Sequence, residues 1–527
     1  MKTLYTGGPI LTMEQPFYAE ALLVENGRIA AVGGRSDLEA QAGRCRRVDL
    51  HGAALMPAFV DAHSHFTQVA LSFLQLSVDG VSDEGALVEA IRDYIRREQI
   101  RPGEWVQVRD YDNNLLPGAH HPARSALDAA APCNPLFVQH KAGHIGLFNS
   151  RALERLGVTE ETPDPEGGRF VRDASGRLTG CAEENALFAV QRKILLPGPK
   201  SLMQAYTKAQ ELYASHGITT VQEGMLDAKM LPLYAMLERS ELLQLDVVAY
   251  PDAAAYPKTK EQFPEAFGRY HHHIRIGGLK MFLDGSPQSR TAWMREPYAG
   301  EPEYRGYGTL SDEAVTENFL LAAREHTQIL AHCNGDAAAQ QYLDCLEQAE
   351  KQAPVLAELR PVMIHAQLLQ RDQMPRLKAL GVIPSFFVAH VYHWGDVHIR
   401  NFGMERASQI SAAASALRCG LRFTFHQDSP VILPDMLETI WCAVERRTRA
   451  GVTLGETERL PVEEALRAVT VNAAYQYFEE GEKGTLAVGK QADLVVLDRN
   501  PLVTPSAELR NIQVLQTIKD GRTIYKQ

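Results

Sequence analysis

Short apolar runs alternate with stretches of helical periodicity from about residue 200 to residue 425. Mainly apolar runs of this length are typical of parallel strands that are buried on both faces. The predicted strands cover residues 217–221, 245–249, 274–283, 329–333, 361–365, 382–387 and 421–425. Helical spacing is clearest at residues 202–213, 336–350 and 407–418, and Gly217 stands where the first of these helices should end.

An earlier apolar run at residues 58–60 is followed by polar residues, as a barrel strand is at its C-terminal end. It completes a set of eight predicted strands. Strands that alternate with helices over this length indicate an α/β protein built on a (β/α)8 TIM barrel. We assign residues 57–480 to this barrel.

The two ends of the chain show turn signals between short apolar runs. Asn26-Gly27 separates the runs at residues 19–24 and 29–32, which is a strong hairpin signal. Asp520-Gly521 follows similar runs at residues 492–497 and 512–517. The shared pattern predicts one small β-sandwich domain, formed by residues 1–56 and 481–527 together.

Residues from about 70 to 200 interrupt this rhythm. Residues 83–98 have helical spacing and residues 105–109 resemble a strand, but much of the remainder is rich in Pro, Gly and Asp. We interpret the segment as a long insertion after barrel strand 1. Long excursions in compact enzymes usually lie over the site, so it is a candidate lid.

The composition excludes several classes of partner. The 527 residues are 45% hydrophobic and 23% charged, which is ordinary for a soluble globular protein. The net charge is −11 and no basic stripe occurs, which argues against nucleic acid or a membrane as a partner. We therefore expect a small-molecule substrate, with a homodimer as the default oligomer.

The seven cysteines are scattered and form no CxxC pair, which is typical of a reduced compartment. No apolar run reaches the length of a signal peptide or of a membrane span. These two observations predict a cytoplasmic protein.

Candidate metal ligands follow the predicted strands at the barrel mouth. His63 and His65 come after the first strand, and their spacing of two places both side chains on one face of an extended segment. Further strands carry Lys280, His332, His365 and Asp428. A single histidine at a strand end is usually structural, but this constellation predicts a metal site. Imidazole and carboxylate suit zinc and similar borderline divalent ions.

At these residues the chain resembles the amidohydrolase superfamily, and within it the amidohydrolase 3 group that includes N-substituted formamide deformylase. The matching segments are Asp61-Ala62-His63-Ser64-His65 and residues 280–292, 331–336, 364–367, 427–430 and 483–494. The chain departs from the common Gly-Ser pattern before the last aspartate, where it has His426-Gln427. The resemblance covers nearly the whole chain and implies a barrel flanked by a β-sandwich.

The resemblance also implies a division of the ligands between two divalent ions. His63 and His65 would hold one ion with Asp428, and His332 and His365 would hold the second. Lys280, carboxylated by carbon dioxide, would bridge the two as a carbamate. An unmodified lysine paired with a carboxylate such as Asp284 is the alternative, and one metal instead of two stays open.

Three residues are candidate substrate contacts. His390 follows barrel strand seven and lies at the predicted mouth. His144, in the insertion, resembles a family position near the site, and Asp284 belongs to the matched segment 280–292. His426 is expected to pack behind the ligands, and Cys333 to face away from them.

The expected reaction is hydrolysis of an amide or N-acyl C–N bond by a metal-activated hydroxide. Asp428 would act as the proton shuttle, taking a proton from water and passing it to the leaving nitrogen. One alternative uses the same centre for ester hydrolysis, decarboxylation or isomerisation. Another is a catalytically silent metal-binding protein.

Overall fold

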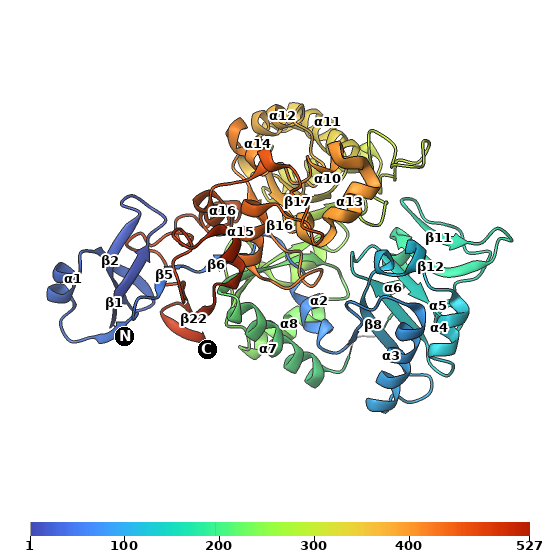
Figure 1. The fold of residues 1–527 in the computed structure, drawn as a ribbon, viewed down its shortest axis with the longest axis horizontal. Helices are drawn as coiled ribbons and strands as arrows, with labels where there is room; N and C mark the ends of the chain where they lie inside the picture. Colours follow the sequence, from blue (N-terminus) through green and yellow to red (C-terminus); the bar gives the residue numbers. More distant parts are fainter. Residues whose placement is uncertain (1, 195–196) are drawn as a thin grey trace.

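Two parallel sheets form the centre of the molecule (Figure 1). The computed structural model describes residues 2–194 and 197–527, so Met1 and residues 195–196 of the predicted insertion lie outside the described part. The first sheet has the order β15-β14-β13-β6 and the second the order β16-β17-β18-β19-β20. The mixed α/β fold that the sequence predicts is thereby confirmed.

The central strands coincide with the runs predicted from the sequence. They are β6 (Phe59–Val60), β13 (Ile218–Leu226), β14 (Asp246–Pro251), β15 (Ile274–Ile276), β16 (Gly278–Phe282), β17 (Gln328–Cys333), β18 (Val362–His365), β19 (Ile383–Phe386) and β20 (Thr424–Phe425). The predicted run 274–283 is divided at Gly277, which lies between β15 and β16. A Cβ atom on Gly278 would lie 2.0 Å from the carbonyl oxygen of Gln328, so only glycine permits this close approach of two strands.

Helices connect and cover these strands. They are α2 (Phe66–Ser72), α7 (Pro199–Ser215), α8 (Leu231–Ser240), α9 (Tyr256–Gln262), α10 (Asp312–Arg324), α11 (Asp336–Gln352), α12 (Met374–Ala379), α13 (His390–Ala407), α14 (Ala413–Cys419), α15 (Met436–Glu445), α16 (Val462–Ala468) and α17 (Val471–Gln476). The single helix predicted for residues 407–418 is wrong. The chain turns at Ser411, whose φ of 47° is left-handed, so α13 and α14 are separate helices.

Both ends of the chain contribute to one eight-stranded sheet, at the left of Figure 1. Its strands are β1 (Lys2–Leu11), β2 (Tyr18–Glu25), β3 (Arg28–Gly33), β4 (Arg46–Asp49), β5 (Ala54–Pro57), β21 (Leu494–Leu497), β22 (Val514–Lys519) and β23 (Arg522–Lys526), and α1 (Arg35–Ala42) packs beside it. β5 pairs with β21, which joins the two chain ends. Both predicted turns have positive φ at their two residues, as tight hairpins require. The domain boundaries stay predictions.

The segment predicted as an insertion contains a six-stranded sheet of its own, at the right of Figure 1. The strands are β7 (Leu76–Ser77), β8 (Val106–Tyr111), β9 (Leu136–His140), β10 (Ile145–Phe148), β11 (Gly168–Arg172) and β12 (Leu178–Glu184). The helices are α3 (Glu84–Arg97), α4 (Arg124–Ala130), α5 (Ser150–Leu156) and α6 (Asn185–Gln191). Two hydrophobic clusters pack against this sheet, so the segment is more regular than its Pro and Gly content suggested.

Among the described residues, no helix combines the length and the apolar character that crossing a bilayer requires. All seven cysteines are free thiols. Cys333 packs into the main hydrophobic core, away from the histidines of the neighbouring strand ends, as predicted.

Candidate metal centre and active site

Several histidines converge on the carboxylate of Asp428 beyond the C-terminal ends of the central strands. The Nε2 atoms of His63 and His65 each lie 3.3 Å from Asp428 Oδ1. His365 Nε2 lies 3.9 Å from the other carboxylate oxygen, Oδ2. Donor atoms of His63, His365 and Asp428 all lie within 4.8 Å of one another, close enough to share one ion.

His332 extends this group by one more imidazole. β17 and β18 are adjacent parallel strands, and their register places His332 beside Ile364 and Cys333 beside His365. His332 Nδ1 therefore lies 3.0 Å from His365 Nε2. The structure thus brings together five of the six ligands that were named from the sequence.

His63 and His65 reach the centre by a different local geometry from the one predicted. β6 ends at Val60, and His65 is the residue that precedes helix α2. The two side chains converge because the chain turns between strand and helix, and strand alternation plays no part. His63 is anchored by Gln222, whose Oε1 lies 2.5 Å from His63 Nδ1.

The backbone is strained at the ligands. His365, Ala366 and Asp428 have φ values of 72°, 45° and 54°, in the left-handed region that residues other than glycine rarely adopt. Such conformations cost roughly 1–3 kcal/mol each and cluster at functional sites. The surrounding packing therefore holds these donors in place.

Three of the histidines, His63, His332 and His365, are uncharged at neutral pH. Burial lowers the pKa of His63, His332 and His365 well below the ordinary value for histidine. The nearby Lys280 lowers the pKa of His63 further. Each ring therefore keeps a nitrogen lone pair that can be donated to a cation.

Lys280 lies on β16 beneath these rings and is 1% exposed. Its Nζ atom has no hydrogen-bond partner within residues 2–194 and 197–527. Burial lowers the pKa of Lys280 to about 7, so a large share of the amine is uncharged at neutral pH. The alternative pairing of Lys280 with Asp284 is not formed.

The donor set fits a divalent metal. Asp428 Oδ1 is buried and accepts no hydrogen bond from any described residue. A buried carboxylate oxygen without donors is costly unless a cation lies beside it. Neutral imidazoles grouped around such a carboxylate are typical ligands of zinc and related ions.

Comparison with known proteins agrees with this geometry. The sequence profile of the amidohydrolase family matches residues 46–525. The chain belongs to the amidohydrolase family. Its resemblance to that family, inferred from the strand-end motifs, is confirmed.

Relatives of this amidohydrolase match it over nearly their full length. An N-substituted formamide deformylase of Arthrobacter pascens is 28% identical over 532 residues, covering 97% of this chain and 95% of that protein. The structure of an uncharacterized metal-dependent hydrolase from Pyrococcus furiosus has a TM-score of 0.73 and 27% identity, covering 95% of this chain and 100% of that one. A second, from Pyrococcus horikoshii OT3, shares the fold with a TM-score of 0.76 at 24% identity, covering 96% and 99% of the two chains.

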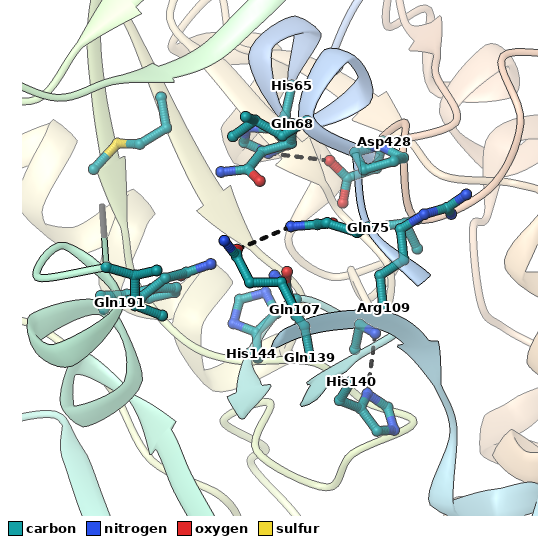
Figure 2. Close-up of a pocket in the computed structure, with 18 of the residues that line it drawn as sticks. His65, Gln68, Gln75, Gln107, Arg109, Gln139, His140, His144, Gln191 and Asp428 are labelled. Atoms are coloured by element: carbon teal, nitrogen blue, oxygen red, sulfur yellow. Dashed lines mark hydrogen bonds and ion pairs between the residues drawn. The ribbon is translucent and has the colours of Figure 1, made fainter. Parts of the chain in front are cut away.

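A pocket of about 240 Å³ leads to the centre of this amidohydrolase (Figure 2). His65, His332 and Asp428 line it from the central strands. Opposite them, the insertion contributes residues of β8, β9 and α6, with Gln107, Gln139 and Gln191 pointing into the space in Figure 2. The insertion therefore forms a wall of the pocket.

His144 is the insertion residue that comes nearest to the ligands. Its ring centroid lies 4.7 Å from that of His332, and it lines the pocket. Its Nδ1 lies 2.6 Å from Glu184 Oε2. Burial alone would lower the pKa of His144, but the carboxylate of Glu184 outweighs burial and raises it. Glu184 is fully buried and has a positive φ of 48°, so it too is held under strain.

The other two predicted substrate contacts do not line the described pocket. Asp284 accepts hydrogen bonds from the backbone N–H groups of Trp293, Asn334 and Gly335, which organises the loops after β16 and β17. His390 is buried in α13, where its Nδ1 lies 3.1 Å from His398 Nε2. Their assignment to the substrate stays a prediction.

Sequence reasoning missed the partners that hold the ligands. Gln222 and Glu184 are distant in sequence from His63 and His144, and neither belongs to a recognisable motif. A strand was predicted at residues 217–221, and the polar residues that follow that run, Gln222 and Glu223, were the available signal.

Proposed function

We propose that this protein is a metal-dependent hydrolase that cleaves an amide or N-acyl C–N bond. The observation that carries the proposal is the convergence of four histidines and Asp428 at one end of a pocket. His63 and His65 would hold one ion with Asp428, and His332 and His365 a second. When bound, such ions supply Lewis acidity, which polarises a carbonyl group and lowers the pKa of water.

Asp428 is the proton shuttle in this proposal. Its carboxylate lies beside the histidines and lines the pocket, so it reaches both an attacking water and a bound substrate. It takes a proton from water as the carbonyl is attacked and later gives it to the leaving nitrogen. Protonation of the nitrogen is required because an amide anion is a very poor leaving group.

Lys280 is proposed to react with carbon dioxide. Its buried, partly uncharged Nζ can add to the carbon atom and release a proton, forming a carbamate. The product is an anionic oxygen donor, which an ammonium group cannot be. The absence of a hydrogen-bond partner for Nζ among the described residues supports this assignment.

His144 is proposed to donate a hydrogen bond to the substrate carbonyl oxygen as negative charge develops. Glu184 accepts at Nδ1, which leaves Nε2 as the atom available to the pocket. A donor that is held in place in a buried site stabilises an oxyanion without reorganisation. The insertion would thus complete the catalytic site.

Replacing Glu184 with Ala should lower kcat/KM by about 100-fold, since a misplaced oxyanion donor costs roughly 10²–10³-fold. Metal content, measured by elemental analysis, should stay unchanged because Glu184 touches no proposed ligand. Glu183→Ala is the matched control: the neighbouring carboxylate pairs with Arg169 and should affect kcat/KM only a few-fold. Equal losses in the two variants would refute the role of Glu184.

An uncharged substrate is favoured because the charges in the pocket wall balance. The acidic and basic lining residues are Asp110, Glu223, Asp227, Asp428, Arg109, Lys141, Arg192 and Lys229. Arg109 pairs with Asp110, and Lys141 Nζ lies 2.7 Å from Asp79. Arg192 lies 3.7 Å from Asp227, and Lys229 donates to the carbonyl of Ile194. Every basic group of the described wall therefore already has a partner within the protein, and none is free to bind a substrate carboxylate.

Glutamine side chains supply the free polar groups of the pocket. Gln75 donates to Gln107 at 3.3 Å (Figure 2). The amides of Gln68, Gln139 and Gln191 form no hydrogen bond with any other described residue. Amides of this kind donate and accept without charge, so they suit neutral amides and hydroxyl groups. The deformylase of Arthrobacter pascens supports N-substituted formamides as the first compounds to test.

The proposed function is tested by metal removal combined with a substrate panel. Chelator-treated protein should lose hydrolysis of neutral N-formyl and N-acyl amines and regain it with Zn²⁺, Mn²⁺ or Co²⁺. A neutral amide should exceed its carboxylate-bearing counterpart at least about tenfold in kcat/KM, because an unpaired buried charge is costly.

Two results would overturn this proposal. Full activity in metal-free protein would exclude the metal from the reaction. Full metal occupancy without turnover of any amide would favour one of the alternatives. Either the same centre catalyses ester hydrolysis or another reaction, or the protein binds metal without catalysis.

We also propose that the two central sheets form one (β/α)8 barrel and that the terminal sheet is a β-sandwich. An isolated parallel bridge between Asp252 and Lys280 links the end of β14 to β16 and supports the first. For the second, separate hydrophobic clusters lie on the terminal sheet, one around Leu22 and Leu494 and another around Leu23 and Leu38.

A further inference from the structure

A chain of hydrogen bonds leads from the metal-facing histidines into the core. His365 Nδ1, on the side of the ring opposite His332, lies 3.1 Å from His426 Nε2. His426 Nδ1 lies 2.8 Å from the hydroxyl oxygen of Ser385. His426 and Ser385 are both fully buried, on adjacent strand ends. The proposed function does not use either of them.

The protons in this chain have only one arrangement that leaves His365 able to bind a cation. If His365 offers its Nε2 lone pair to the centre, its proton lies on Nδ1 and is donated to His426 Nε2. The proton of His426 then lies on Nδ1 and is donated to Ser385 Oγ. Both imidazole rings then have a partner at each of these nitrogens, and a buried imidazole without such partners would be costly.

Packing fixes the orientation of the His426 ring. Its centroid lies 5.2 Å from that of His63 and 5.4 Å from that of Phe387. Its backbone N–H donates to the carbonyl of Phe386 at 3.3 Å. The ring is thus held between three aromatic side chains, with Nε2 directed at His365.

His63 is supported in the same manner. Its Nδ1 lies 2.5 Å from Gln222 Oε1, which leaves Nε2 facing Asp428. Gln222 donates in turn to the carbonyl of Ala62 at 2.9 Å, so its oxygen must face the histidine. Two of the proposed ligands therefore have a buried acceptor behind the ring.

We propose that His426 is a positioning residue that sets the tautomer and orientation of His365 for metal binding, with Ser385 setting the tautomer of His426 in turn. The inference rests on the proposed metal centre and extends it to two residues outside the ligand set. Partners of this kind typically change metal affinity by 10–100-fold when they are removed.

The experiment measures Zn²⁺ affinity of the full-length protein by competition with a chromophoric chelator. His426→Ala should weaken binding roughly 10–100-fold. His426→Gln should recover most of that loss, because Gln Oε1 can accept from His365 Nδ1 at the position of Nε2. Ser385→Ala removes only a hydroxyl group and should weaken binding several-fold, and it serves as the test if His426→Ala does not fold.

His398→Ala is the matched control. His398 is as buried as His426 but bonds to His390, which lies outside the ligand set. It should lose stability without a change in Zn²⁺ affinity, so an equal loss of affinity in this variant would mean that His426 acts only through general packing.

The Co²⁺-substituted protein supplies a second readout. Its visible spectrum should change in His426→Ala and revert towards the parent spectrum in His426→Gln.

Two results separate this inference from the proposed function. If the parent protein binds Zn²⁺ and folded His426→Ala binds it equally well, the inference is wrong and the metal centre stands. If the parent protein binds no divalent ion, both fail.

Discussion

Replacing Asp428 with Asn is expected to abolish most turnover while leaving the fold intact. Removal of a general acid–base group typically costs 10²–10⁴-fold, and here the group is also a proposed ligand, so we expect a loss of about 10³-fold or more in kcat. The amide cannot take the proton from water. Asn tolerates the left-handed φ of 54° at this position, and Oδ1 loses no hydrogen bond.

The measurement is kcat on the best substrate of the panel, at saturating Zn²⁺, together with the thermal midpoint. Asp372→Asn is the control, since Asp372 is an exposed carboxylate paired with Arg295 and should leave kcat unchanged. Hydrolysis at near the parent rate by folded, metal-loaded Asp428→Asn would show that another group moves the proton.

Replacing Lys483 with Met is expected to destabilise the protein by about 3 kcal/mol, the lower end of the usual effect of breaking a buried ion pair, because Asp246 and Glu479 each lose one charged partner and keep another. Lys483 is 3% exposed, and its Nζ lies 2.6 Å from Asp246 Oδ2 and 3.0 Å from Glu479 Oε2. Lys519 lies 2.9 Å from the same oxygen of Asp246. The cluster connects the start of β14 to the terminal sheet, far from the metal ligands.

The destabilisation caused by Lys483→Met should become smaller as the pH falls. Burial by itself would raise the pKa of Asp246, but the ammonium groups of Lys483 and Lys519 outweigh it and hold that pKa well below its usual range. The stabilisation from Asp246 is therefore complete above the ordinary aspartate pKa of about 3.9 and is lost as the pH falls further. With Lys483 removed this loss should be smaller, so variant and parent should converge in stability as the pH is lowered below about 3.9.

Chemical denaturation across this pH range measures both effects. Lys258→Met, at an exposed lysine of α9, is the control and should change stability by less than about 0.5 kcal/mol. A Lys483→Met variant as stable as the parent at pH 7 would mean that the buried cluster contributes specificity without net stability.

The sequence was sufficient to locate the central strands and the residues that gather at their ends. Runs buried on both faces are nearly continuous in apolar residues, and this pattern does not depend on what packs against them. The ends of parallel strands meet at one edge of a sheet, so His332, His365 and Asp428 could be placed together before any coordinates were known. The hairpin turns could also be predicted from the sequence, because Asn-Gly and Asp-Gly favour the left-handed conformations that such turns require.

The sequence could not supply the strands of the insertion. Five of its six strands escaped notice because they are short and separated by Pro- and Gly-rich loops that resemble irregular structure. His390 was assigned to the substrate from its position after a strand and Asp284 from a matched segment, and in the structure the first contacts His398 and the second accepts from backbone N–H groups. The position of a residue along the chain identifies the loop to which it belongs, but it does not determine which side chains of that loop reach the pocket.

The chain by itself thus determined which residues form the strand ends at the centre, because periodicity and residue chemistry are local properties. Only the tertiary structure decided how His63 and His65 converge, which wall the insertion forms, and which groups stand behind each ligand. His426 behind His365 and Glu184 behind His144 are contacts between segments 61 and 40 residues apart. No local pattern encodes such pairs, since they exist only when the strands and the insertion pack together.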